Sequence, residues 1–435
     1  MKKHLIFILI LLLFVETAIT QDFLTIKQAI DIGLENNYGI RLGKQDLNIA
    51  ENNNTYGNAG FLPRLNVNAA QTNSVTNSHQ AFLTGQVNDR SGAKSDAFNA
   101  GLQLNWTIFD GLKMFARRDQ LQQLEEMGEM QLLLTVENTI TNIHVNYFTL
   151  VQLMKQKKVL EKTITIGNER LALADDKLAF GSGSKLEVLQ ALVDLHSDSA
   201  AYMNLLDQIS RNTITINTLL GRSPEIIFAL DDQIELRSGL VYDSLEKQLL
   251  HRNTSLLLSK KDEQLAQLAL KEIKARLYPE IGLNVGYNFL NQKSESGFLA
   301  ENRSLGLTYG LTASMNLFNG LNTQREQKNL RVQIESNRLQ VESLQNELIA
   351  ELKSSFSSYS NKLKLRVMES HNLTSAQENL NIAGERFELG DLSGIEFREA
   401  QRNYLEAETR LLLVILEIKI LETHLLQLAG MLTGG

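Results

Sequence analysis

The sequence contains no cysteine and only three prolines among its 435 residues. Without cysteine the protein can have no disulfide, no thiolate nucleophile and no acylated N-terminal cysteine. The prolines are Pro63, Pro224 and Pro279, so long stretches of the chain contain no strong helix breaker. Long uninterrupted helices are therefore expected.

After its first residues the chain also lacks any long apolar segment. Lys2 and Lys3 precede an apolar run from Leu5 to Val15, and small or polar residues follow before Gln21. That run is too short to span a bilayer and is typical of a removable signal peptide, which we assign to residues 1–21. No later run reaches the roughly 18 apolar residues of a membrane helix. Any part of the exported protein that enters a membrane must therefore do so as β-strands.

The formal net charge of −7 argues against a nucleic-acid partner, because phosphate binding needs clustered Lys and Arg. The seven histidines are scattered, and none forms a metal-binding pair at helical spacing. No glycine-rich phosphate loop and no nucleophile motif is present. The sequence therefore predicts no enzyme activity, no cofactor and no metal site.

The most informative feature is an internal duplication. Phe109-Asp110-Gly111-Leu112 recurs as Phe318-Asn319-Gly320-Leu321, an offset of 209 residues, and the same offset maps Gly181 onto Gly390. This period is too long for a solenoid repeat and indicates a duplicated half-molecule. We expect one repeat at residues 22–221 and a second at 245–435, joined by a linker at 222–244.

Each repeat is expected to begin with a helical stretch, at 25–56 and 245–277, that ends before a proline. The apolar period then changes to two: Leu305, Leu307, Tyr309 and Leu311 alternate with Gly306, Thr308, Gly310 and Thr312. A soluble half-buried sheet would also alternate, but the uncharged polar face here favours strands between lipid and water. We expect hairpins over about 62–109 and 279–318, with polar loops over about 71–94 and 292–303.

Helical periodicity returns after each hairpin, and we expect helical hairpins over about 110–220 and 319–430. From Leu133 to Met154 the apolar residues step by three and four in alternation, which predicts a coiled-coil seam. A helix from 112 to 180 would be roughly 100 Å long. Gly181 and Gly390 suit the left-handed position that ends a helix. The Ser-x-x-Glu that follows each glycine, at Ser184–Glu187 and Ser393–Glu396, is a capping box that begins the next helix.

Two hairpins supply only four long strands, and four strands cannot close a barrel. Because an open sheet edge is not tolerated in lipid, the chain is expected to share a barrel with further copies.

The order of these elements resembles the TolC family of outer-membrane efflux proteins over essentially the whole mature chain. The segments Lys177–Gly181 and Arg386–Gly390 are similar to the tip motif of that family, and Thr25–Asn37 is similar to its opening helix, although the usual Asn-Pro is here Asn37-Tyr38. The resemblance implies a mainly α fold with a membrane β part: a homotrimer whose 12-stranded β-barrel is continued by a periplasmic α-helical barrel.

The same resemblance implies a function. The protein would be the outer-membrane channel of a tripartite efflux or type I secretion system, conducting cargo passively from an inner-membrane pump and a periplasmic adaptor. Its other partners would be copies of itself and outer-membrane lipid. Drugs, metal ions, siderophores and secreted proteins are all compatible with the sequence as cargo, and so are proton-driven and ATP-driven pumps.

The resemblance also implies two groups of site residues. Acids line the periplasmic aperture of the family, and the matching positions are Glu396 and Glu399, with Glu187 and Gln190 in the first repeat. Three converging copies of Glu399 would make the closed pore prefer cations. The tip turns are expected to dock the adaptor through Lys177, Gly181, Ser184, Arg386, Phe387, Gly390 and Ser393.

For several of these residues a purely structural role is the alternative. Glu187 and Glu396 are the acids of the capping boxes, and Lys177 and Arg386 lie in a last helical turn, where a cation favours the helix dipole. Two other functions also compete. A structural or adhesive coiled-coil surface protein would explain the seams but not the paired hairpins. A periplasmic adaptor would carry a further domain between the arms of one helical hairpin and would not be duplicated.

Overall fold

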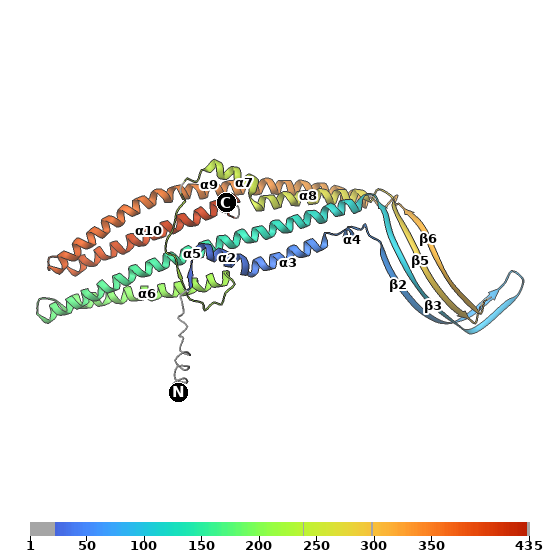
Figure 1. The fold of residues 1–435 in the computed structure, drawn as a ribbon, viewed down its shortest axis with the longest axis horizontal. Coiled ribbons are helices and arrows are strands. Elements are labelled where there is room, and N and C mark those ends of the chain that lie inside the picture. The colour runs from blue at the N-terminus through green and yellow to red at the C-terminus, as the bar shows by residue number, and fades with distance from the viewer. Residues whose placement is uncertain (1–21, 238, 297–298, 433–435) are drawn as a thin grey trace, which may run out of the picture. The chain divides into compact units, whose positions relative to one another are not determined.

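The computed structural model describes residues 22–237, 239–296 and 299–432 (Figure 1). The predicted signal peptide, residues 1–21, lies outside the described residues. The chain divides into two compact units, each described here by itself. The first contains the residues up to Gly43, Leu133–Asn253 and the residues from Asn346 onward. The second contains Lys44–Leu132 and Thr254–Gln345.

The second unit contains the sheet predicted from the period-2 pattern. Its strands are β2 (Arg64–Ala81), β3 (Val87–Asp110), β5 (Glu280–Ser294) and β6 (Glu301–Ser314). They form one antiparallel sheet in the order β2-β3-β5-β6, as Figure 1 shows. The two repeats therefore join through the β3–β5 pair, in which Ser95 lies opposite Ser294 and Asp110 opposite Glu280. The strands at the two edges are β2 and β6.

The first hairpin is longer than the sequence pattern indicates. The polar loop expected over about 71–94 is wrong, because β2 and β3 pair from Gln71–Phe98 out to Ala81–Val87. Strand pairing is carried by backbone hydrogen bonds and does not need apolar side chains, so the polar segment continues the ladder. The second hairpin departs less from the expectation, with its strands ending at Ser294 and resuming at Glu301.

The β3–β5 pairing is irregular at Ile108. Thr107 lies opposite Gly282, but the next paired residue is Phe109, opposite Ile281. The extra residue, Ile108, acts as a bulge and shifts the alternation by one. Phe109 therefore lies on the same face as Trp106, a position that strict alternation gives to Ile108.

The helical stretch expected at the start of each repeat is interrupted. Residues 25–56 form α2 (Ile26–Asn36), α3 (Tyr38–Asn53) and the short α4 (Tyr56–Ala59). In place of one helical stretch over 245–277, the second repeat has two helices, α7 (Tyr242–Arg252) and α8 (Thr254–Ala275). A single extended asparagine separates the helices in both repeats, Asn37 and Asn253.

These asparagines connect the start of each repeat to its end within the first unit. The Asn37 side-chain amide donates to the carbonyl of Leu219 at 2.8 Å, and that of Asn253 donates to Leu428 at 3.1 Å. Leu219 and Leu428 end the returning helices, whose last carbonyls have no partner within the helix. Helical periodicity cannot reveal such a break, because the hydrogen bond that stabilises it comes from a distant part of the chain.

Two helical hairpins make up most of the first unit, although the first residues of their long helices, 113–132 and 322–345, belong to the second unit. The first hairpin pairs α5 (Lys113–Ala179) with α6 (Lys185–Leu219), and the second pairs α9 (Asn322–Glu388) with α10 (Gly394–Leu428). Both α5 and α9 have 67 residues, as the absence of proline predicts, and a helix of that length spans about 100 Å. In the described part of the chain, no helix is both long and apolar enough to cross a bilayer.

The predicted seam lies in the core of this unit. Ile143, Tyr147 and Leu150 are almost completely buried, and they pack with Ile216 and Leu220 of the first hairpin. In the second repeat Leu352 and Tyr359 are buried in the same way. These contacts confirm that the alternating spacing of three and four marks a packed helix face.

The linker is attached through contacts that the sequence pattern does not reveal. Phe228–Leu230 forms β4, which pairs in parallel with β1 (Asp22–Leu24). The hydroxyl of Tyr147 donates to the carbonyl of Leu24 at 3.0 Å, and that of Tyr359 donates to Arg237 at 2.8 Å. The two tyrosines therefore attach the N-terminal strand and the linker to the helices. Burial raises the pKa of Tyr147 to about 12.

Candidate functional site at the tips of the helical hairpins

The turn at each tip has the predicted conformation. Gly181 and Gly390 have φ angles of +74° and +79°, the left-handed region that ends a helix. A Cβ atom at either glycine would meet nothing within 4 Å, so backbone conformation alone favours glycine there. These turns connect α5 to α6 and α9 to α10.

Both capping boxes are present. The hydroxyls of Ser184 and Ser393 each accept a hydrogen bond from the backbone N–H of the glutamate three residues later, at 3.3 Å. The carboxylates of Glu187 and Glu396 accept in return from the serine N–H groups, at 3.4 and 3.0 Å. The hydroxyl and the backbone N–H of Ser393 lower the pKa of Glu396. The structural role expected for the two glutamates is therefore confirmed.

The basic residues of the last helical turns have partners that the sequence did not predict. The ammonium of Lys177 lies 4.9 Å from the ring centroid of Phe387, and that ring stacks on Phe397 at 4.8 Å. Arg386 forms an ion pair with Asp391 at 3.2 Å. Lys177 and Phe387 come from different hairpins, so the cation–π contact joins the two tips.

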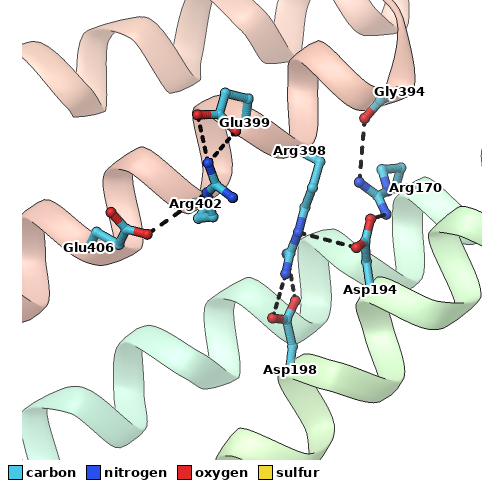
Figure 2. Close-up of polar contacts among 8 residues, drawn as sticks. All are labelled: Arg170, Asp194, Asp198, Gly394, Arg398, Glu399, Arg402 and Glu406. Atoms are coloured by element: carbon cyan, nitrogen blue, oxygen red, sulfur yellow. Dashed lines mark hydrogen bonds and ion pairs between the residues drawn. The ribbon is translucent and has the colours of Figure 1, made fainter.

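A buried group of charges also joins the two hairpins (Figure 2). Arg398 on α10 donates two hydrogen bonds to Asp198 on α6, at 2.7 and 2.8 Å. Asp194, one turn earlier on α6, lies 3.7 Å from Arg398 and also pairs with Arg170 of α5. We call Arg170, Asp194, Asp198 and Arg398 the inter-hairpin cluster.

The inter-hairpin cluster is partly shielded from water, since Arg398 and Asp194 are 21% and 34% exposed. The side chains of Arg170 and Asp198 are only 5% and 7% exposed. Hydrogen bonding to Asp198 is the main cause that raises the pKa of Arg398. Because replacing one partner leaves a buried charge uncompensated, single substitutions of Arg170 or Asp198 are expected to be costly.

The duplication contains a signal that could have identified the inter-hairpin cluster. At the offset of 209 residues, all four members correspond to uncharged residues. Arg170 corresponds to Asn379 and Arg398 to Leu189, while Asp194 and Asp198 correspond to Asn403 and Ala407. Charges that occur in only one repeat are not needed to form either helical hairpin. Such positions are candidates for contacts between the two.

The proposed aperture acid Glu399 lies outside the inter-hairpin cluster. Its carboxylate pairs with Arg402 at 2.8 Å on the exposed side of α10, and its side chain is about half exposed, at 53%. The corresponding residue in the first repeat, Gln190, lines a recess of about 1190 Å³ between the hairpins.

This recess brings together many of the residues singled out from the sequence. It is lined by Lys177, Glu187, Gln190, Phe387, Gly390, Ser393 and Glu399, together with members of the inter-hairpin cluster. Among the described tip residues, Gly181, Ser184, Arg386 and Glu396 lie outside its lining. In the part of the chain that the structure describes, no three histidine or acidic side chains gather as a metal site.

Comparison with known proteins agrees with this architecture. The sequence matches the family described as outer membrane efflux protein over residues 29–222 and 245–431. The pyoverdine export outer membrane protein OpmQ of Pseudomonas aeruginosa is 24% identical over 193 residues, which are 43% of this chain and 40% of OpmQ. The matched stretch therefore spans less than half of that curated relative.

Solved structures show the same fold. The outer membrane channel CmeC of Campylobacter jejuni has a TM-score of 0.79 and 16% identity, covering 93% of this chain and 85% of CmeC. The outer membrane protein VceC of Vibrio cholerae has a TM-score of 0.76 and 16% identity, with 93% and 96% covered. The matched family consists of outer-membrane channels, with a helical part in the periplasm, rather than enzymes. The family match covers most of the chain in two blocks, and this chain belongs to the outer membrane efflux protein family.

Proposed function

We propose that the protein is the exit duct of an export machine, conducting cargo passively across the outer membrane. One observation supports this most directly. The four strands join into a single sheet, and β3 passes within three residues into α5, a 67-residue helix. This connection suits a membrane pore that continues into a tunnel. The matching order in the second repeat doubles the tunnel wall within one chain.

The sheet requires further copies of the chain. Its edges, β2 and β6, carry no strand partner on their outer sides among the described residues. In lipid such edges must be paired, because no water is available to satisfy their backbone groups. Pairing β6 of one copy with β2 of the next closes a ring, and three copies give the 12 strands expected from the family resemblance.

The tips supply a surface for a periplasmic adaptor. Four large apolar side chains at the two turns are mostly exposed: Phe180 at 86%, Leu186 at 63%, Leu389 at 84% and Ile395 at 66%. Exposed apolar groups concentrated at one site are typical of protein interaction surfaces. We assign adaptor docking to these groups and to the turn residues around Gly181 and Gly390. An inner-membrane pump would then deliver cargo through the adaptor.

The aperture lies at the same end in this proposal. Glu396 and Glu399, with Glu187 and Gln190, surround the opening when three tips converge. The inter-hairpin cluster holds the second hairpin against the first and keeps the opening narrow. Parting the hairpins breaks the contact of Arg398 with Asp198, so this contact favours the closed state.

The test is conduction through the purified mature protein in planar lipid bilayers. Discrete channels are expected. Asp198→Asn should raise their open probability, because it removes the negative charge that pairs with Arg398 across the two hairpins. Asp207→Asn is the matched control, since Asp207 forms an exposed pair with Arg211 on the same helix. It should leave the channels unchanged.

Two outcomes separate the parts of this proposal. If the reconstituted protein formed no channels, the exit-duct function would be rejected. If it formed channels that Asp198→Asn left as tightly closed as the control, the duct would stand and the role of the inter-hairpin cluster would be rejected. Heat-modifiable mobility of each variant in gels establishes that its barrel has folded.

A further inference from the structure

A row of alternating charges runs along the exposed side of α10. Glu399, Arg402, Glu406 and Arg410 follow one another at helical spacing, with side chains between 48% and 58% exposed. Arg402 lies 2.8 Å from Glu399 and 3.8 Å from Glu406. Figure 2 shows Arg402 between these two acids. Arg410 lies 3.9 Å from Glu406. We call these four residues the charge ladder.

Packing against α9 explains only one member of the charge ladder, Arg410, which lies 3.2 Å from the largely buried Glu369. Exposed ion pairs add little to stability, because water screens them and the side chains lose freedom. The first repeat provides an internal comparison. At the corresponding positions α6 carries Gln190, Val193, Ser197 and Ala201, all uncharged, yet α6 and α10 have the same length of 35 residues. We therefore expect the charge ladder to serve a role that the second hairpin has and the first hairpin lacks.

The main consequence of the charge ladder is a local charge balance. Arg402 is the base that contacts Glu399, whereas Arg410 pairs with both Glu406 and Glu369 of α9. Of two neighbouring acids, only one is paired with a cation. Arg386 pairs with Asp391, and Glu396 accepts hydrogen bonds from Ser393 at the positive end of the α10 dipole. In three converging copies of this tip, Glu399 is therefore paired with a base, whereas Glu396 keeps its negative charge.

We propose that Arg402 sets the ion selectivity of the aperture by neutralising Glu399. This inference rests on the proposed function, in which three copies of this face surround the opening. With Arg402 present, Glu399 adds little to the cation preference of the opening and offers multivalent cations no strong binding site. Anionic cargo, such as molecules bearing carboxylate or phosphate groups, meets less repulsion there than an unpaired Glu399 would cause.

The experiment measures the permeability ratio of K⁺ to Cl⁻ in planar bilayers under a KCl gradient. Arg402→Gln leaves Glu399 unpaired in each copy, so the ratio should rise by roughly threefold or more, and Mg²⁺ should begin to block. Glu399→Gln leaves Arg402 in excess and should shift the ratio the other way. The double variant restores the balance and should return to the wild-type ratio.

Arg211→Gln is the control, because it removes an arginine from a similar exposed pair on α6. It should not change the ratio. The inference is overturned if Arg402→Gln and Glu399→Gln conduct with the wild-type ratio, or if both shift it in the same direction. Those results leave the exit-duct function in place. Failure of the wild-type protein to form channels rejects that function and this inference together.

Discussion

At the scale of single residues, each tip depends on a serine that caps the returning helix. The side chain and backbone of Ser393 hold Glu396, and Glu396 holds Ser393 in return. The same pairing at Ser184 and Glu187 shows that the box serves both repeats. The capping role of Glu396 and its proposed place at the aperture are compatible, because a capping carboxylate still faces solvent.

The cap leads to a prediction for Ser393→Ala. Loss of an N-cap hydroxyl costs about 1 kcal/mol, so the first turn of α10 should open about fivefold more often. Amide hydrogen exchange at residues 394–397 measures this opening. Ser184→Ala should act in the same way on α6 and leave α10 unchanged. Unchanged exchange in both variants would mean that the turns are held by other contacts.

The capping box also predicts a dependence on pH. The folded state lowers the pKa of Glu396 below the ordinary value of 4.5, through hydrogen bonds from Ser393. A lowered pKa means that the stabilisation is present above pH 4.5 and is lost as the pH falls through the folded value. Protection of the first α10 turn should therefore decrease on acidification, and Glu396→Gln should abolish that decrease.

At the scale of elements, the junction between the start and the end of each repeat decides where the helices stop. Gly221 and Gly430 both have a φ angle of +64°, and each follows the end of a returning helix. A Cβ atom added at Gly221 would lie 2.5 Å from the carbonyl oxygen of Asn36. One added at Gly430 would lie 2.6 Å from the carbonyl oxygen of Arg252. The breaks in the helices at Asn37 and Asn253 and the close approaches at the two glycines form the same joint. This joint occurs once in each repeat.

This joint predicts that Gly430→Ala is more harmful than Gly390→Ala. Both glycines are left-handed, and forcing alanine into that conformation costs roughly 1–2 kcal/mol. Only Gly430 also meets a backbone carbonyl, and relieving that overlap should add about 1–3 kcal/mol. The thermal unfolding midpoint, followed by the helical circular dichroism signal, measures the difference. Equal midpoints would show that the chain moves away from residue 430 at little cost.

At the scale of the whole molecule, the unpaired edges of the sheet predict the assembly. The purified protein in detergent should have three times the chain mass, and heating should convert it to monomers of different gel mobility. Light scattering corrected for bound detergent measures that mass. A stable folded monomer would contradict the edge-pairing argument itself, because four strands would then have to satisfy their edges in some other way.

The sequence alone was sufficient for every feature that depends on neighbouring residues. The duplication, the two 67-residue helices, the glycine turns and the capping boxes follow from periodicity and from the few residue types that stop or start a helix. The polar segment over about 71–94 was misassigned as a loop, because a local polar pattern cannot tell an unpaired loop from the far end of a paired ladder.

Only the tertiary structure decided which distant elements meet. It determined the pairing of β3 with β5, the breaks at Asn37 and Asn253, and the contact between Asp198 and Arg398, which are 200 residues apart. A periodic pattern specifies which face of an element is apolar or charged. It does not specify the partner, because that depends on the free energy of packing all the faces together.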